Sequence, residues 1–212
     1  MPLTLDDPWI VRETDIDESA LGARESVFAL TNGAVGMRGT LDEGDPRHSR
    51  GTFMAGVFET HPLSYPEGGY GDPQEGEAMV AVADGSVIRL LVDGMPFEVD
   101  AVSPQVHERR LDLRAGTLER EVVWATPSGA RVRLRSSRLV SLTQCAQSAI
   151  RYEVAVLSGQ ARIHVRSVLD VNNIPPEIEN DDPRVSAALE ASFEALVTGQ
   201  EGSGAPRRWD NP

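Results

Sequence analysis

Apolar and polar residues alternate in short runs along most of the 212-residue chain. In a β-strand successive side chains point to opposite faces, so this alternation predicts strands with one buried and one solvated face. Gly, Pro, Asp and Ser separate the runs, and the whole pattern predicts an all-β, antiparallel two-sheet sandwich of roughly nine to eleven strands. Predicted strands include residues 53–58, 79–82, 87–92, 95–99, 105–113, 117–125, 131–142, 147–157 and 162–170.

The same alternation assigns side chains to the faces of each strand. Trp124 shares one strand face with Leu118, Arg120 and Val122, so we expect it in the core. In the last predicted strand, Ile163, Val165 and Leu169 are expected to face the interior.

Between Glu25 and Gly44 the chain reads ESVFALTNGAVGMRGTLDEG, which predicts a tight corner. A β-prone run at Ser26–Leu30 stops at Asn32-Gly33, and Asn-Gly is a strong turn signal because both residues tolerate a positive φ. A second strand follows at Ala34–Leu41. Gly36 and Gly39 flank Arg38 there, and glycine within a strand marks a bulge or the close approach of another backbone or a ligand.

The loop at residues 61–76 and the chain from Val171 onward depart from this alternating pattern. Residues 61–76 form a Pro- and Gly-rich loop, which is long enough to suggest a role in binding. Residues 185–197 have apolar positions at helical spacing, which predicts a short C-terminal helix. We therefore expect one β domain over residues 1–198, which can be incomplete, and a disordered tail over residues 199–212.

Charge and composition narrow the class of protein. The net charge of −13 argues against nucleic acid and anionic membrane surfaces, which attract clustered Lys and Arg. The single cysteine, Cys145, rules out an internal disulfide and lies in a strand-like run, so a buried and inert thiol is expected. No apolar run approaches the roughly 20 residues of a membrane helix, and no signal peptide is recognisable, which predicts a cytoplasmic protein.

Several segments together resemble the first domain of glycoside hydrolase family 65, the maltose, trehalose and kojibiose phosphorylases and related hydrolases. They stand in the family's order across nearly the whole chain, thinning after about Asn180. The matching segments are Trp9, Glu25–Thr40 (ESVFALTNGAVGMRGT), Glu43-Gly44, Gly51–Glu59 (GTFMAGVFE) and Arg110–Arg120 (RLDLRAGTLER).

The resemblance implies a galactose-mutarotase-like super-sandwich that packs on a C-terminal (α/α)6 barrel. By resemblance the catalytic carboxylates and the main phosphate site lie on that barrel, and inorganic phosphate is the co-substrate of the phosphorylases; no cofactor is implied. This chain offers no positions for those carboxylates, so we expect a non-catalytic domain. Its expected partners are the barrel, an α-glucosyl disaccharide and a second copy of the full-length enzyme.

The acidic residues present do not suggest a catalytic pair by themselves. Asp112, in Leu-Asp-Leu, is expected to hold Arg110 or the amides of a turn, because buried carboxylates are rarely left unpaired. The other acids that qualify by residue type are Glu25, Glu43, Glu59 and Asp170.

Two interpretations of the corner stay open. In the structural one, Asn32, Gly33, Gly36, Arg38 and Gly39 build a tight turn, with Arg38 paired to an acid such as Glu43. In the functional one, this corner packs against the barrel near its sugar pocket, and Arg38 or Asn32 orients the barrel's substrate loop.

Other residues are candidates for binding contacts because of their residue type. Tyr65 and Tyr70, in the long loop, are candidates to contact a sugar or a partner. Arg131, Arg133 and Arg135 form an outward row, to which Arg162 and Arg166 can be adjacent, and a salt-bridged or solvated face is expected there. The four histidines show no metal-ligand spacing.

Two further functions stay open. A free-standing carbohydrate-binding module would bind maltose, trehalose or kojibiose by itself. An aldose epimerase would need a His and a Glu at one sugar site, for which His107 or His164 is available without any supporting spacing.

Overall fold

The computed structural model describes residues 4–14, 16–44, 51–62, 70–71, 73–99, 102 and 104–170. The chain divides into two compact units, of which the first comprises Met1–Ala55 with Ala81–Asn173 and the second Gly56–Val80 with Ile174–Pro212. Tyr65, the predicted C-terminal helix and the predicted tail lie outside the described residues.

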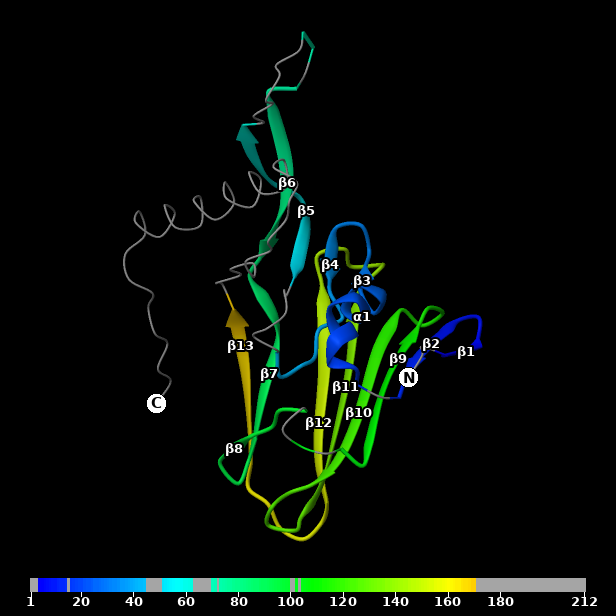
Figure 1. The fold of residues 1–212 in the computed structure, drawn as a ribbon, viewed down its shortest axis with the longest axis vertical. Coiled ribbons are helices and arrows are strands. Elements are labelled where there is room, and N and C mark those ends of the chain that lie inside the picture. Colours follow the sequence, from blue (N-terminus) through cyan, green and yellow to red (C-terminus); the bar gives the residue numbers. More distant parts are fainter. Residues whose placement is uncertain are drawn as a thin grey trace, which may run out of the picture. The chain divides into compact units, whose positions relative to one another are not determined.

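A six-stranded antiparallel sheet forms the largest layer of the first unit (Figure 1). Its order is β1-β2-β9-β10-β11-β12, so three consecutive hairpin strands, β10 to β12, follow β9 on one side. The strands are β1 (Thr4–Asp7), β2 (Ile10–Glu13), β9 (Val106–Asp112), β10 (Thr117–Ala125), β11 (Arg131–Val140) and β12 (Ser148–Ser158).

A three-stranded antiparallel sheet has the order β13-β7-β8. It comprises β7 (Asp84–Val92), β8 (Met95–Pro96) and β13 (Ile163–Asp170). The predicted turn between β7 and β8 is confirmed, because both Asp93 (φ 54°) and Gly94 (φ 83°) have the positive φ that a tight hairpin needs.

A third sheet has the order β3-β4-β5-β6, so the described residues contain three antiparallel sheets. Its strands are β3 (Leu30–Thr31), β4 (Val35–Met37), β5 (Thr52–Pro62) and β6 (Glu75–Val82). β5 begins in the first unit and ends in the second, whereas β6 begins in the second and ends in the first.

The strand predicted over Ser26–Leu30 is wrong at every residue but Leu30. A short 3-10 helix, η1 (Glu18–Ala20), leads into the helix α1 (Leu21–Val27), and only Leu30–Thr31 is extended. Leu21, Arg24, Glu25 and Phe28 are buried at the three- and four-residue spacing of one helix face. Tertiary contacts on that face therefore override the local β propensity.

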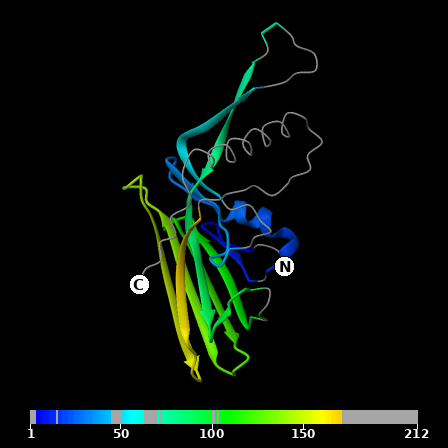
Figure 2. The same ribbon diagram turned by 90° about the vertical axis from the view of Figure 1, so that its left-hand side faces the viewer.

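Two apolar clusters form the core. The first lies between the six-stranded sheet and β7, and there the Trp124 ring lies 4.3 Å from that of Phe97, as expected for a core tryptophan. The second combines Phe28 and Leu30 with Leu111 and Leu118 of the large sheet. Figure 2, turned by 90° from Figure 1, shows α1 beside the strands of the large sheet.

Two expectations about burial are wrong. Val165 and Leu169 are 52% and 67% exposed, although Ile163 packs on the core as predicted. Cys145 lies in the loop between β11 and β12 rather than in a strand, and its thiol is exposed.

Candidate functional site

Asn32 and Gly33 form the turn between β3 and β4, as the sequence predicts. Gly33 has a φ of 86°, and β3 pairs with β4 so that Leu30 lies opposite Met37. The Asn32 side-chain oxygen accepts hydrogen bonds from the amides of Ala34 and Val35 (2.9 and 2.8 Å). The asparagine thus fixes its own turn from within.

The other end of the Asn32 amide reaches a distant loop. Its nitrogen donates to the backbone oxygens of Ser141 (2.7 Å) and Cys145 (3.0 Å), in the β11–β12 connection. All four hydrogen-bonding positions of the amide are therefore used. Asn32 joins the β3–β4 turn to the end of the large sheet.

Arg38 is paired, but with a different acid from the one that we expected. Its Nη2 donates to the Gly22 oxygen (2.8 Å) in α1 and lies 3.5 Å from the buried Glu25 carboxylate. Glu43, the predicted partner, binds Arg120 instead (2.8 Å). α1 brings Glu25 to Arg38, and the sequence pattern did not show this helix.

Gly39 is required by a close backbone approach, whereas Gly36 is not. A Cβ at position 39 would lie 2.5 Å from Phe28 Cβ and 2.6 Å from the Phe28 oxygen. At position 36 the nearest atom would be Thr31 Oγ1 at 3.6 Å, an ordinary contact. The absence of a side chain at Gly39 therefore lets the backbone after Arg38 pass in close contact with Phe28.

A buried ionic cluster beside this corner escaped the sequence analysis. Arg109 donates through Nε to Glu13 (2.5 Å) and through Nη1 to the Gly39 oxygen (2.9 Å), and its guanidinium stacks on Phe28 at 4.6 Å. Arg24 of α1 also pairs with Glu13. The alternation of side chains along β9 puts Arg109 on the inward face. That position is the one signal in the sequence that could have indicated a buried charge.

A second buried cluster surrounds Asp42. Its carboxylate accepts hydrogen bonds from Arg138 (2.6 and 3.1 Å) and Ser136 (2.6 Å), and Arg120 lies 3.3 Å away. Burial by itself would raise the pKa of Asp42, but Arg138 and Arg120 outweigh burial, so the pKa is lowered. The backbone oxygen of Asp42 accepts from Ile88 of β7 (2.8 Å), so the segment after Arg38 connects the large sheet with the three-stranded one.

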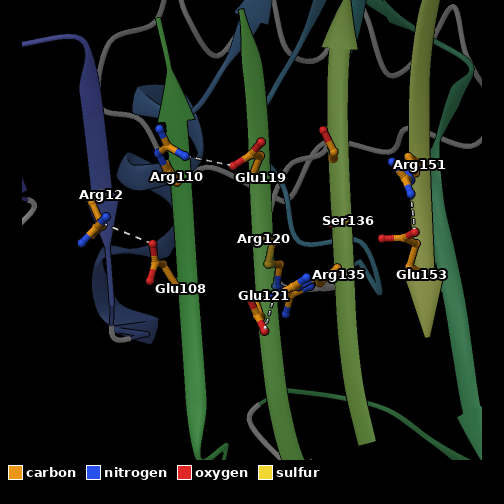
Figure 3. Close-up of a pocket in the computed structure, with 11 residues that line it drawn as sticks. Arg12, Glu108, Arg110, Glu119, Arg120, Glu121, Arg135, Ser136, Arg151 and Glu153 are labelled. Carbon is orange, nitrogen blue, oxygen red and sulfur yellow. Dashed lines mark hydrogen bonds and ion pairs between the residues drawn. The ribbon is translucent and has the colours of Figure 1, made fainter. Parts of the chain in front are cut away.

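The outer face of the large sheet carries charged side chains in pairs, which line a shallow hollow (Figure 3). Glu121 pairs with Arg135 at 3.0 Å, and Asp112 accepts from Arg110 (3.2 Å) and from the amides of Arg114 and Ala115. The expected role of Asp112 is thus confirmed. Further exposed pairs are Arg12–Glu108, Arg110–Glu119 and Arg151–Glu153.

The arginine row behaves as a salt-bridged face, as expected for Arg135. Arg162 and Arg166 are not next to it, because β13 pairs with β7 in another sheet. Exposed pairs of this kind contribute little to stability, with a median of about 0–1 kcal/mol.

His107 lies inside the sandwich and not in an open site. It is 6% exposed, and neither ring nitrogen has a hydrogen-bond partner among the described residues. Burial, reinforced by the charges of Arg120 and Arg109, lowers the pKa of His107 to about 2. A neutral, enclosed imidazole does not suit the acid–base role of an epimerase.

Tyr70 is fully exposed in the second unit, and Tyr65 is outside the described residues. Within the described part of the chain, no three His, Cys, Asp or Glu residues come together as metal ligands. In the same residues, no helix has the length and apolar character needed to cross a membrane.

The match to a family model decides the affiliation. Residues 11–205 match the model of the glycosyl hydrolase family 65 N-terminal domain. The chain belongs to glycosyl hydrolase family 65. This family 65 domain contains the corner and the two ionic clusters described above.

Known relatives agree with this affiliation. An uncharacterized glycosyl hydrolase of Mycobacterium tuberculosis is 45% identical over 190 residues, covering 90% of this chain and 24% of the relative. The alpha,alpha-trehalose phosphorylase of Thermoanaerobacter brockii is 35% identical over 185 residues, covering 85% and 24%. The family 65 domain thus spans about a quarter of the length of these relatives.

A solved structure supports the fold. A chain described as a kojibiose phosphorylase from human microbiome superposes with a TM-score of 0.62, at 24% identity, over 70% of this chain and 20% of that chain. The expected all-β, antiparallel fold is confirmed.

Proposed function

We propose that this chain is a non-catalytic domain that packs on the catalytic domain of a family 65 enzyme acting on α-linked glucose disaccharides. The relatives named as trehalose and kojibiose phosphorylases support this substrate class. Inorganic phosphate is then the co-substrate of the assembled enzyme, and a cytoplasmic location and a homodimer are part of the same proposal.

One observation carries the non-catalytic assignment. The charged residues of the corner are engaged in internal pairs: Glu25 with Arg38, and Asp42 and Glu43 with Arg120 and Arg138. A general acid needs an open position beside a substrate, and an inverting pair needs a separation of about 6.5–9.5 Å that admits water or phosphate. Carboxylates enclosed by arginines stabilise a scaffold instead.

An exposed side chain in each unit supports a contact role. Asn32 fixes the β11–β12 loop, which presents Leu142 at 76% exposure, and Tyr70 projects fully from the second unit. Large exposed apolar and aromatic side chains are typical anchors of protein interfaces. We assign these elements to the interface with the catalytic domain and its substrate loop.

A turnover assay tests the proposal. The chain alone should release neither glucose nor glucose 1-phosphate from trehalose, kojibiose or maltose, with or without phosphate. Co-expression with the part of the Thermoanaerobacter brockii trehalose phosphorylase that follows its matched 185 residues should give phosphorolysis of trehalose.

Variants of the co-expressed complex locate the interface. Leu142→Asp and Tyr70→Ala should lower turnover and leave the melting temperature of the isolated chain unchanged. Glu119→Gln, on the outer sheet face, is the matched surface control. Turnover by the chain alone, or millimolar sugar binding by it in calorimetry, would contradict the proposal and favour an autonomous enzyme or binding module.

A further inference from the structure

The β3–β4 turn contains the one Asn-Gly step of the chain, Asn32-Gly33. Such a step is chemically labile, because glycine has no side chain to hinder attack by its backbone nitrogen on the asparagine side chain. In that attack the Gly33 nitrogen gives its proton to solvent and forms a bond to Cγ of Asn32. The side-chain nitrogen takes up a proton and leaves as ammonia. Water then opens the resulting succinimide ring, which leaves aspartate or isoaspartate at position 32.

Two of the four hydrogen bonds of the Asn32 amide favour this attack. The Oδ1 atom accepts from the backbone amides of Ala34 (2.9 Å) and Val35 (2.8 Å). Attack on Cγ places negative charge on Oδ1, and two backbone N–H groups directed at that atom stabilise the charge as they do in an oxyanion hole. The turn by itself therefore favours the reaction of Asn32.

The other two hydrogen bonds oppose it. The Nδ2 atom donates to the backbone oxygens of Ser141 (2.7 Å) and Cys145 (3.0 Å) in the β11–β12 loop. This nitrogen has to gain a proton before it leaves as ammonia, whereas both of its neighbours are carbonyl groups, which accept hydrogen bonds and supply no proton. The β11–β12 loop thus holds the leaving group in place.

The attacking nitrogen is also engaged in the folded protein. The Gly33 N–H donates to Thr31 Oγ1 (3.1 Å). A hydrogen-bonded amide gives up its proton to solvent mainly when it opens, which is why such amides exchange slowly with water. Reaction at Asn32 therefore requires the turn and the loop to open.

We propose that Asn32 is a latent site of spontaneous deamidation, with water as the co-reactant, and that the β11–β12 loop controls its rate. The closed loop protects the amide, and an open loop lets Gly33 attack. The product carries a carboxylate, which only accepts hydrogen bonds and cannot hold the Ser141 and Cys145 oxygens again, so the change is one-way. The site consists of this chain's own residues, so the inference does not rest on the proposed function.

Ageing of the chain tests the proposal. The chain is kept in mildly alkaline buffer with and without guanidinium chloride, and the conversion of Asn32 to aspartate and isoaspartate is followed by peptide mapping with mass spectrometry. We expect the folded chain to deamidate at least about tenfold more slowly than the unfolded chain, because the free energy of local opening slows the reaction.

Ser141→Gly should loosen the loop and leave the residues of the turn unchanged. It removes the hydroxyl that accepts from the Gln144 N–H (2.9 Å), and it frees the backbone next to the oxygen that binds Asn32. We expect folded Ser141→Gly to deamidate at least about threefold faster than the parent, as the loss of one hydrogen bond implies. Gln144→Ala keeps the backbone amide and changes an exposed side chain, so this matched control should deamidate at the parent rate.

Hydrogen exchange separates loop opening from global unfolding. The β10 amides, in the middle of the large sheet, should exchange at the same rate in all three proteins. A Ser141→Gly acceleration that β10 exchange matches would trace the reaction to global unfolding and overturn the proposal.

Three other outcomes would also overturn it. These are a folded parent that deamidates as fast as the unfolded chain, a Ser141→Gly rate equal to the parent rate, and an equal acceleration by Gln144→Ala. None of these measurements depends on turnover, so their failure is distinguishable from a failure of the proposed function.

Discussion

Gly39 has no side chain because Phe28 leaves no room for one. A Cβ there would lie 2.5 Å from the Phe28 side chain and 2.6 Å from its carbonyl oxygen, and Phe28 is fixed by the stacked Arg109. Gly39→Ala should lower the free energy of unfolding by about 2 kcal/mol, as overpacking does. Gly36→Ala, with its nearest atom at 3.6 Å, is the matched control and should be close to neutral in urea denaturation. Equal effects of the two substitutions would contradict this account.

Arg38 should matter for stability before anything else. Arg38→Ala removes the donor to Gly22 and one partner of the buried Glu25, so we expect a loss of about 1–3 kcal/mol in urea denaturation. Arg38→Lys, which keeps the charge, should recover part of it. In the co-expressed complex, a loss of turnover in a variant that is fully folded at the assay temperature would show an additional role at the interface.

His107 should make the protein sensitive to mild acid. The folded state keeps the imidazole neutral, with a pKa of about 2, whereas the unfolded chain binds a proton near pH 6.5. Because the folded pKa is the lower one, stability is complete above pH 6.5 and is lost as the pH falls toward 2. At pH 5 this loss amounts to about 2 kcal/mol. His107→Leu should remove it, so the difference in stability between pH 7 and pH 5 should shrink in the variant when both proteins are compared by thermal unfolding.

At the scale of elements, the Asn32 side chain connects the β3–β4 turn with the β11–β12 loop. Asn32→Asp keeps the acceptor of the β3–β4 turn but sets a carboxylate against the Ser141 and Cys145 oxygens. The β11–β12 loop should then become more mobile. A spin label on Cys145, the chain's one thiol, reports this directly as a narrowed spectrum. Thr143→Ala, in the same loop, should leave the spectrum unchanged.

Strands were predictable where hairpins repeat, and the helix was not. β10 was predicted with its observed bounds, and Trp124 as core, because Leu118, Val122 and Trp124 recur at even spacing on one face of the strand. α1 was missed because its buried face contains Arg24 and Glu25, whose partners Glu13 and Arg38 lie outside the helix. The alternation along β13 predicted that Val165 faces the interior. Alternation tells which face of the strand carries a side chain, but not whether a neighbouring element covers that face.

The turn of the candidate site could be predicted from the sequence, but its network of ion pairs could not. Asn32-Gly33 carries its own signal in the sequence. The pairing of Glu25 with Arg38, and of Glu43 with Arg120, depends on how α1 and the large sheet meet, and no local pattern contains that information.

For the whole molecule, the Asp42 cluster should set the limit of acid stability. Asp42 has a lowered pKa, so its contribution is complete above about pH 4 and is lost as the pH falls through the folded value. The carboxyl carbon of Asp42 should therefore titrate below 3.8 in carbon NMR. Asp42→Asn should cost about 3–5 kcal/mol at pH 7, because it leaves two buried arginines with weaker partners. A variant as stable as the parent would contradict a structural role for this cluster.

The two buried ionic clusters also constrain the order in which the chain can fold. Glu13 and Arg109 are 96 residues apart, as are Asp42 and Arg138. Contacts of such separation are slow to form, because the intervening chain loses its freedom before the contact is made. During synthesis, the residues up to Gly44 emerge long before β11. Their carboxylates therefore stay hydrated until β11 has also emerged. The N-terminal corner should therefore be among the last parts of the chain to become native.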